Sequence, residues 1–150
     1  MTLKDRLMAD MKTAMRQGDT VRRDTIRMTR AAIKNIEIDL QREATDEDVV
    51  EVILRQVKRR NEAAEMFRQG GREELAAAEE AQAEILQEYL PEQLTAEEIR
   101  EVVQEIVDEM GATSMQQMGP VMGKAMSRLK GKADGHLVNE IARDILSRQV

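Results

Sequence analysis

Apolar residues recur every three or four positions along almost the whole chain, which is the spacing of one face of an α-helix. Capping residues, glycines and prolines divide this pattern into seven predicted helices. The first five run over residues 3–17, from 19 or 20 to about 42, 45–70, 73–90 and 95–111. The sixth begins after Ser114, and Pro120 could split or restart it. The seventh begins after Asp134. No segment has the alternation of a β-strand, so the sequence predicts an all-α protein.

The natural boundary lies at the segment Leu90-Pro91-Glu92-Gln93-Leu94, because proline ends a helix and few apolar residues surround it. Four longer helices precede this segment and three shorter ones follow it. We therefore expect two domains: an N-terminal bundle of about four helices over residues 1–91, and a small three-helix tail domain over residues 92–150.

Composition narrows the classes of function. The chain has 150 residues, a net charge of −6, 41% hydrophobic residues and no cysteine. No apolar run approaches the ~20 residues that span a bilayer, and the first residues do not resemble a signal peptide. We expect a protein of the cytoplasm that does not enter a membrane. Its negative charge argues against indiscriminate binding to nucleic acid duplexes.

One window departs from this acidic background. Residues 110–133 contain no Asp or Glu, although the chain has 29 acidic residues. The window carries four basic residues, and the first three lack a carboxylate three or four positions away in the same helical run. It also carries Gly119 and Gly123, which together could form a smooth surface. This pattern predicts a binding surface for a large anion; the alternative is that the glycines only end helices or allow close helix packing. The four basic residues are Lys124, Arg128, Lys130 and Lys132.

Two further basic clusters have simpler interpretations. In the second helix four basic residues share a face, and they could contact RNA or an acidic partner, or be solvated. This first cluster is Arg23, Arg27, Arg30 and Lys34. The apolar stripe expected opposite them is Val21, Thr25, Met28, Ala32 and Ile36. The second cluster lies in the third predicted helix and is more simply a solvated helix face. Its members are Arg55, Lys58, Arg59 and Arg60.

Signals for catalysis are weak. The segment from Gly119 to Ala125 is one residue short of a phosphate-binding loop, and Ala125 replaces the hydroxyl residue that would bind magnesium. His136 is the only histidine, so with no cysteine it cannot build a zinc site alone. We expect no catalytic residues, no metal and no cofactor. One Tyr and one Phe cannot form a platform for stacking bases, which leaves recognition of shape and phosphates.

Several motifs resemble the GatB/YqeY family. The tail carries Met118-Gly119, Met122-Gly123, Lys130-Gly131 and Ala133-Asp134-Gly135, and the N-terminal half carries Ala31-Ala32-Ile33-Lys34-Asn35, Gly70-Gly71-Arg72 and Glu88-Tyr89-Leu90-Pro91. The resemblance implies two all-helical subdomains, the last of which contacts tRNA in the B subunit of the glutamine-dependent tRNA amidotransferase. Carried over to this chain, the tail motif nominates as RNA contacts Lys124, Arg128, Lys130, Gly131, Lys132 and Gly135.

The same resemblance limits the expected activity. The large domain that activates the tRNA-bound carboxylate is absent here, and nothing resembles a glutaminase subunit. The resemblance therefore links this chain to carbon–nitrogen ligases only by family kinship and does not imply that the chain itself catalyses that reaction. The leading hypothesis is an accessory RNA-binding protein for tRNA, with Arg27 and Arg30 as additional contacts and a tRNA-charging or amidotransferase protein as a further partner. The alternative is a helical adaptor that docks another protein without binding RNA. An enzyme in its own right is a third hypothesis.

Overall fold

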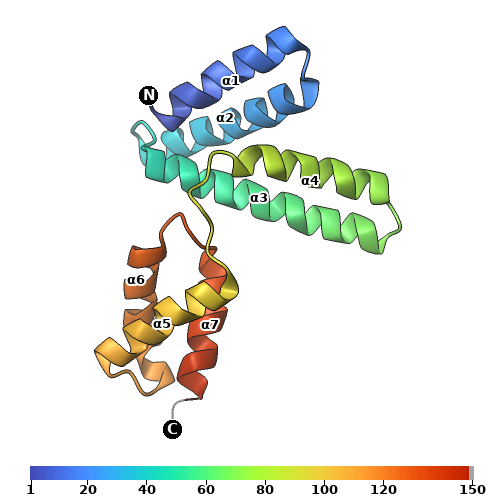
Figure 1. Ribbon diagram of the computed structural model, residues 1–150. Helices are drawn as coiled ribbons and strands as arrows, with labels where there is room; N and C mark the ends of the chain where they lie inside the picture. Colours follow the sequence, from blue (N-terminus) through green and yellow to red (C-terminus); the bar gives the residue numbers. More distant parts are fainter. Residues whose placement is uncertain (149–150) are drawn as a thin grey trace. The chain divides into compact units, whose positions relative to one another are not determined.

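The computed structural model describes residues 1–148 and is helical throughout this range, with no strand (Figure 1). This confirms the predicted all-α class. The described helices are α1 (Leu3–Gln17), α2 (Thr20–Leu40), α3 (Asp46–Gln69), α4 (Glu73–Gln87), α5 (Ala96–Met110), the short 3₁₀ helix η1 (Met115–Gln117), α6 (Met118–Leu129) and α7 (Gly135–Ser147).

Most helix ends fall where the local sequence predicts them. Thr45 and Thr95 form capping boxes that begin α3 and α5. Gly18 and Gly111 end α1 and α5 in the left-handed conformation, with φ of 71° and 63°. A left-handed residue at this position lets the backbone satisfy the last carbonyl groups of a helix, and glycine adopts it without steric cost.

Two helices end earlier than predicted. α2 ends at Leu40, since Gln41 takes the left-handed conformation with φ 56° and not the helical one. α4 ends at Gln87, because Tyr89 and Leu90 donate to the carbonyls three residues earlier, which tightens the last turn. Pro120 does not split α6. It is the third residue of that helix, where the missing N–H would have no intrahelical partner.

The chain divides into two compact units, the first formed by Met1–Leu90 and the second beginning at Pro91. The two expected domains were residues 1–91 and 92–150, and their independent folding stays a prediction. Residues 149–150 lie outside the described part of the chain. Within that part, no helix is both long and apolar enough to cross a bilayer.

In the first unit, α1 pairs with α2 and α3 pairs with α4 (Figure 1). Its core includes Leu7, Ile26, Ile53 and Leu86, each with no exposed surface. Tyr89 joins the end of α4 to α1: its ring is buried, its hydroxyl donates to Asp10, and the Arg6 guanidinium lies 4.5 Å from the ring centroid. The tyrosine of the family motif thus has a structural role here.

The predicted apolar stripe of α2 is confirmed in part. Thr25 is buried, and Ala32 and Ile36 pack against the core, but half of each side chain of Val21 and Met28 is exposed. The buried face is rotated toward Ile26, Thr29 and Ile33. Thr29 escapes the cost of burial because its hydroxyl donates to the Thr25 carbonyl one turn earlier.

In the second unit, α5, α6 and α7 surround one core that includes Ile99, Val103, Val121, Leu129 and Ile145. The apolar face of α7 lines this core, with Leu137 at the edge. One face of α6 is therefore committed to the core, and the other face remains available for binding.

Candidate nucleic-acid interface

The outward face of α6 lacks side chains at two positions one turn apart, Gly119 and Gly123. Gly119, Pro120 and Gly123 are exposed, and a Cβ atom built on either glycine would meet no atom within 4 Å. Gly123 lies in the interior of the helix, where glycine costs about 1 kcal/mol relative to alanine. No contact inside the described chain offsets this cost. The glycines therefore do not serve helix packing within the second unit, which was the alternative drawn from the sequence.

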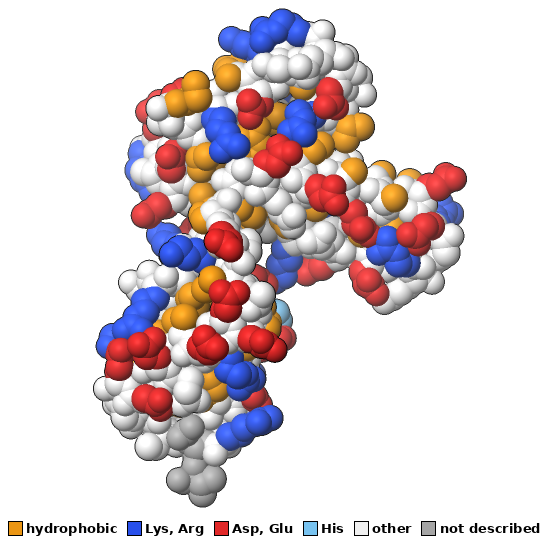
Figure 2. Space-filling model, in the orientation of Figure 1, with side chains coloured by type: hydrophobic (Ala, Val, Ile, Leu, Met, Phe, Trp, Pro, Cys, Tyr) orange, Lys and Arg blue, Asp and Glu red, His pale blue; other side chains and the backbone are white. Residues whose placement is uncertain are grey.

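The two basic residues of α6 do have carboxylate partners, contrary to the charge pattern of their own segment. Glu109 on α5 lies 3.7 Å from the Lys124 ammonium and 2.8 Å from the Arg128 guanidinium. Glu105 lies 3.8 Å from Arg128 as well. Helix packing thus brings the acids of α5 beside a window that has none in sequence. Acidic and basic side chains are intermixed across the visible surface of the molecule in the same way (Figure 2).

The turn after α6 presents Lys130 and Lys132, both exposed, on either side of a buried glycine. Gly131 has φ 77°, a conformation that disfavours every residue with a Cβ. Its carbonyl accepts a hydrogen bond of 2.7 Å from the Gln93 side chain, and the Lys132 carbonyl accepts one of 2.9 Å from the Leu94 N–H. Gly131 thus has a structural reason to be glycine, namely the shape of the turn that displays the two lysines.

Sequence reasoning missed Gln93 and Leu94 as the residues that hold this turn. Gln93 lies 38 positions before Gly131, and no periodic pattern in the sequence connects the two segments. Gly135 begins α7, and a Cβ there would lie 3.4 Å from the Met126 side chain. That contact gives Gly135 a packing role between α6 and α7.

The remaining nominated residues lie on α2 in the first unit. Arg27 is exposed, and Arg30 is half-buried with its guanidinium 3.6 Å from the Met11 sulfur. Arg60, interpreted from sequence as part of a solvated basic face, points inward instead. It is 8% exposed, lies 3.3 Å from Glu79 and donates to Gln82. The solvated-face interpretation is therefore wrong for Arg60.

His136 lies on the surface, 3.0 Å from Glu140, with both side chains more than 60% exposed. Among residues 1–148, no group of three or more His, Cys, Asp and Glu side chains is arranged to hold a metal ion. The raised pKa of Tyr89 has a structural origin: its burial comes first, followed by its hydrogen bond to Asp10.

Fold and surface together define a small all-helical protein with a bare, cation-flanked helix face in its second unit. The chain belongs to the family described as Yqey-like protein, which matches residues 4–146. It is similar to "Altered inheritance of mitochondria protein 41, mitochondrial" of Pyrenophora tritici-repentis, with 33% identity over 94% of this chain and 79% of that protein. The protein of the same name from Lachancea thermotolerans is 35% identical over 56% of this chain and 46% of its own length. An uncharacterized protein of Schizosaccharomyces pombe is 32% identical over 60% of this chain and 70% of its own length.

Proposed function

We propose that this chain is an accessory RNA-binding protein whose RNA is tRNA, related by kinship to the tail of the tRNA amidotransferase B subunit. The observation that carries this proposal is the exposed face of α6, where Gly119 and Gly123 have no packing partner. A helix that lacks side chains at two positions one turn apart lets a sugar–phosphate backbone approach its main chain there. The four basic residues of the window flank that face or the turn beyond it.

The ion pairs of Lys124 and Arg128 do not prevent phosphate binding. Both pairs are on the surface, with side chains that are 51% and 38% exposed. Such pairs contribute only about 0–1 kcal/mol each, so a phosphate can replace the carboxylate at small cost. Lys130 and Lys132 add charge at the turn. This arrangement favours recognition of backbone and shape over base sequence.

Binding of labelled, folded tRNA measured by fluorescence anisotropy tests the proposal. If all four basic residues meet phosphates, the affinity should fall with salt at a log–log slope of roughly −3. The variant Lys130→Glu/Lys132→Glu should bind at least about tenfold more weakly, since each lost phosphate contact removes part of the electrostatic term. The matched control is Arg100→Glu/Arg143→Glu, which makes the same change in net charge on exposed positions of α5 and α7 in the same unit.

Equal weakening in both variants would show only an effect of net charge and would contradict a specific surface. Unchanged binding in Lys130→Glu/Lys132→Glu would contradict the proposed site directly. Arg27→Glu/Arg30→Glu then tests whether α2 contributes contacts of its own.

A second candidate function is the helical adaptor without RNA binding. The ion pairs from Glu105 and Glu109 favour it, because they neutralise two of the four cations and leave a smooth helix face that another helix could approach. Binding to a protein through that face should respond little to salt, in contrast to RNA binding.

The partner protein and the cellular location are part of the same proposal. A tRNA-charging or amidotransferase protein would be the natural partner of an accessory tRNA-binding chain. The expected cytoplasmic location also stays a proposal, and the mitochondrial names of the fungal relatives refer to those proteins.

A further inference from the structure

The proposed RNA surface leaves a groove between α1 and α2 in the first unit unexplained. This groove has a volume of about 460 Å³. Met8, Ala9 and Ile33 form its apolar floor. On α1 it extends from Lys4 to Lys12, eight residues apart, which corresponds to about 12 Å of helix or two turns.

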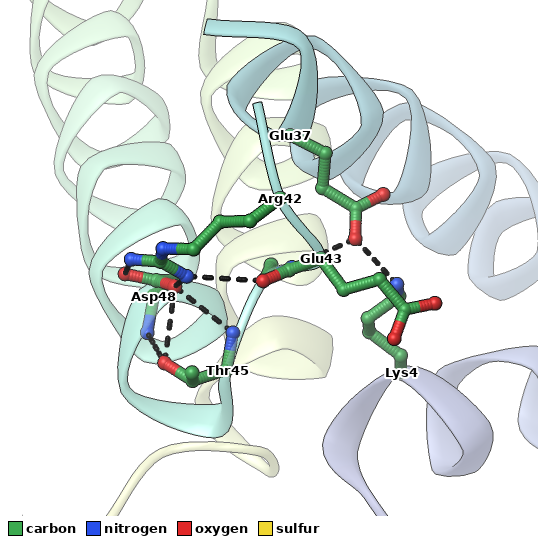
Figure 3. A network of polar contacts seen from close by, with 7 residues as sticks. Lys4, Glu37, Arg42, Glu43, Thr45 and Asp48 are labelled. Atoms are coloured by element: carbon green, nitrogen blue, oxygen red, sulfur yellow. Dashed lines mark hydrogen bonds and ion pairs between the residues drawn. The ribbon is translucent and has the colours of Figure 1, made fainter. Parts of the chain in front are cut away.

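One end of this groove is closed by carboxylates that are already engaged. Glu37 accepts a hydrogen bond of 2.5 Å from the Lys4 ammonium and one of 2.8 Å from the Ala44 N–H (Figure 3). Asp5 takes part in the capping box with Thr2 that begins α1. The Lys4 charge is therefore neutralised locally, and the two acids keep this end of the groove negative or neutral.

The other end is cationic. Lys12 on α1 and Arg30 on α2 line it, and Lys34 lies between this end and Glu37 on the same helix. The hydrogen bond from Lys4 first, and then the Lys34 charge, help to lower the pKa of Glu37. None of the three cations Lys12, Arg30 and Lys34 makes an ion pair with a carboxylate in the part of the chain that the structure describes. The groove thus has an apolar floor, a neutralised end and a basic end.

We propose that this groove docks an acidic amphipathic helix of a partner protein. A third helix laid between two antiparallel helices covers the floor of Met8, Ala9 and Ile33, and its Asp or Glu residues face the basic end. Helix-in-groove recognition combines apolar anchors at helical spacing with flanking charges in this way. A continuous polyanion fits less well, because along the same 12 Å it meets Asp5 and Glu37 as well as the cations. A small anion would meet only Lys12, Lys34 and Arg30, and ion pairs at the surface contribute only about 0–1 kcal/mol each.

The asymmetry of the groove supplies a sharp test. The probe is a labelled synthetic helix of about 14 residues, or four turns, with leucines along one face and glutamates in one half only. Its isomer has the same composition but carries glutamates in both halves. The isomer must place glutamate near Asp5 and Glu37 in whichever direction it lies, whereas the probe can avoid them. We expect the probe to bind at least about tenfold more tightly than the isomer in fluorescence anisotropy.

Variants of the full chain locate the binding. Lys12→Glu/Lys34→Glu should weaken binding of the probe by about tenfold or more, because charge reversal turns two attractions into repulsions. Arg55→Glu/Arg59→Glu makes the same change in net charge on exposed positions of α3 and should leave binding within about twofold. Ala9→Trp fills the floor without removing a core side chain and should also weaken binding. Circular dichroism checks that each variant is folded.

Equal affinity for the probe and its isomer, or equal effects of the two double variants, would overturn the proposal. Displacement of the probe by folded tRNA, with loss of tRNA binding in Lys12→Glu/Lys34→Glu, would also overturn it and make the groove an RNA surface. Since the proposed tRNA surface lies in the second unit, Lys130→Glu/Lys132→Glu should leave binding of the probe intact. The two proposals can therefore fail separately.

Discussion

Replacing Gly123 by alanine separates stability from function in the proposed RNA surface. Gly123 is the sixth residue of α6, in its interior, and a Cβ there would meet no atom within 4 Å. The substitution therefore gains helix propensity without a clash. We expect Gly123→Ala to stabilise the protein by about 1 kcal/mol. This corresponds to a rise in Tm of about 4–8 °C if the second unit unfolds alone, and about 2–4 °C if the whole chain unfolds together.

Gly111→Ala is the matched control for this measurement. A Cβ at Gly111 would also meet no atom within 4 Å, but Gly111 has φ 63° at the end of α5. Only the backbone conformation distinguishes the two sites, and an L-residue in the left-handed region costs roughly 1–2 kcal/mol. The two substitutions should therefore shift Tm in opposite directions in thermal unfolding followed by circular dichroism.

The effect of Gly123→Ala on tRNA binding should be unfavourable, in contrast to its effect on stability. If a phosphate backbone approaches the main chain of α6, the added methyl group of Gly123→Ala should weaken binding of folded tRNA although the protein is more stable. Gly111 lies at the end of α5 and not on α6, so Gly111→Ala should bind tRNA as the wild type does, provided that it remains folded. A stabilised Gly123→Ala protein with unchanged tRNA affinity would refute the claim that the bare face serves close approach.

Four other outcomes can be measured directly. Hydrogen bonds from Arg42 first, and then from the Thr45 backbone, lower the pKa of Asp48 below its ordinary value of 3.8 (Figure 3). The stabilisation from ionised Asp48 is present above that ordinary value and is lost as pH falls toward the lowered pKa, so Asp48→Asn should flatten the decline of stability below about pH 4. Limited digestion with a glutamate-specific protease should cut first after Glu92, which is exposed between the two units; preferred cleavage inside α5 would contradict two independently folded units. Arg60→Ala should cost about 2–3 kcal/mol of unfolding free energy, and Arg60→Met less, because methionine keeps the buried packing but not the charge. The purified chain supplied with glutamine, ATP and misacylated tRNA should show no amide transfer, and turnover abolished by one point mutation would show the opposite.

The sequence predicts this fold well where local interactions decide it. Thr45 and Thr95 cap the helices they were expected to cap, because a capping box involves residues only three positions apart. Gly18 and Gly111 end helices for an equally local reason. The apolar stripe of α2 was right at Thr25, Ala32 and Ile36 but not at Val21 and Met28, because neighbouring faces also carry methyl groups and packing against other helices selects between them.

The candidate site was less predictable because its charges are paired through space. Glu109 lies 19 positions before Arg128 in sequence but 2.8 Å from it in the fold. Arg60 faces inward for the same kind of reason: its partner Glu79 belongs to another helix, 19 positions away. Counting charges along a segment finds the basic residues but not their partners. The bare face of α6 could be suspected from two glycines four positions apart, and the structure shows that no side chain covers it.

The two hydrogen bonds that hold the lysine turn also set the length of the tether between the units. Gln93 and Leu94 are fastened to Gly131 and Lys132, so the free tether is reduced to the residues around Pro91 and Glu92. A ligand that preserves the turn leaves both hydrogen bonds in place. A ligand that reshapes the turn must break them and free the side chain of Gln93 and the backbone of Leu94. Occupancy of the turn would then appear as a change in the local stability of the segment from Pro91 to Leu94, which hydrogen exchange measures.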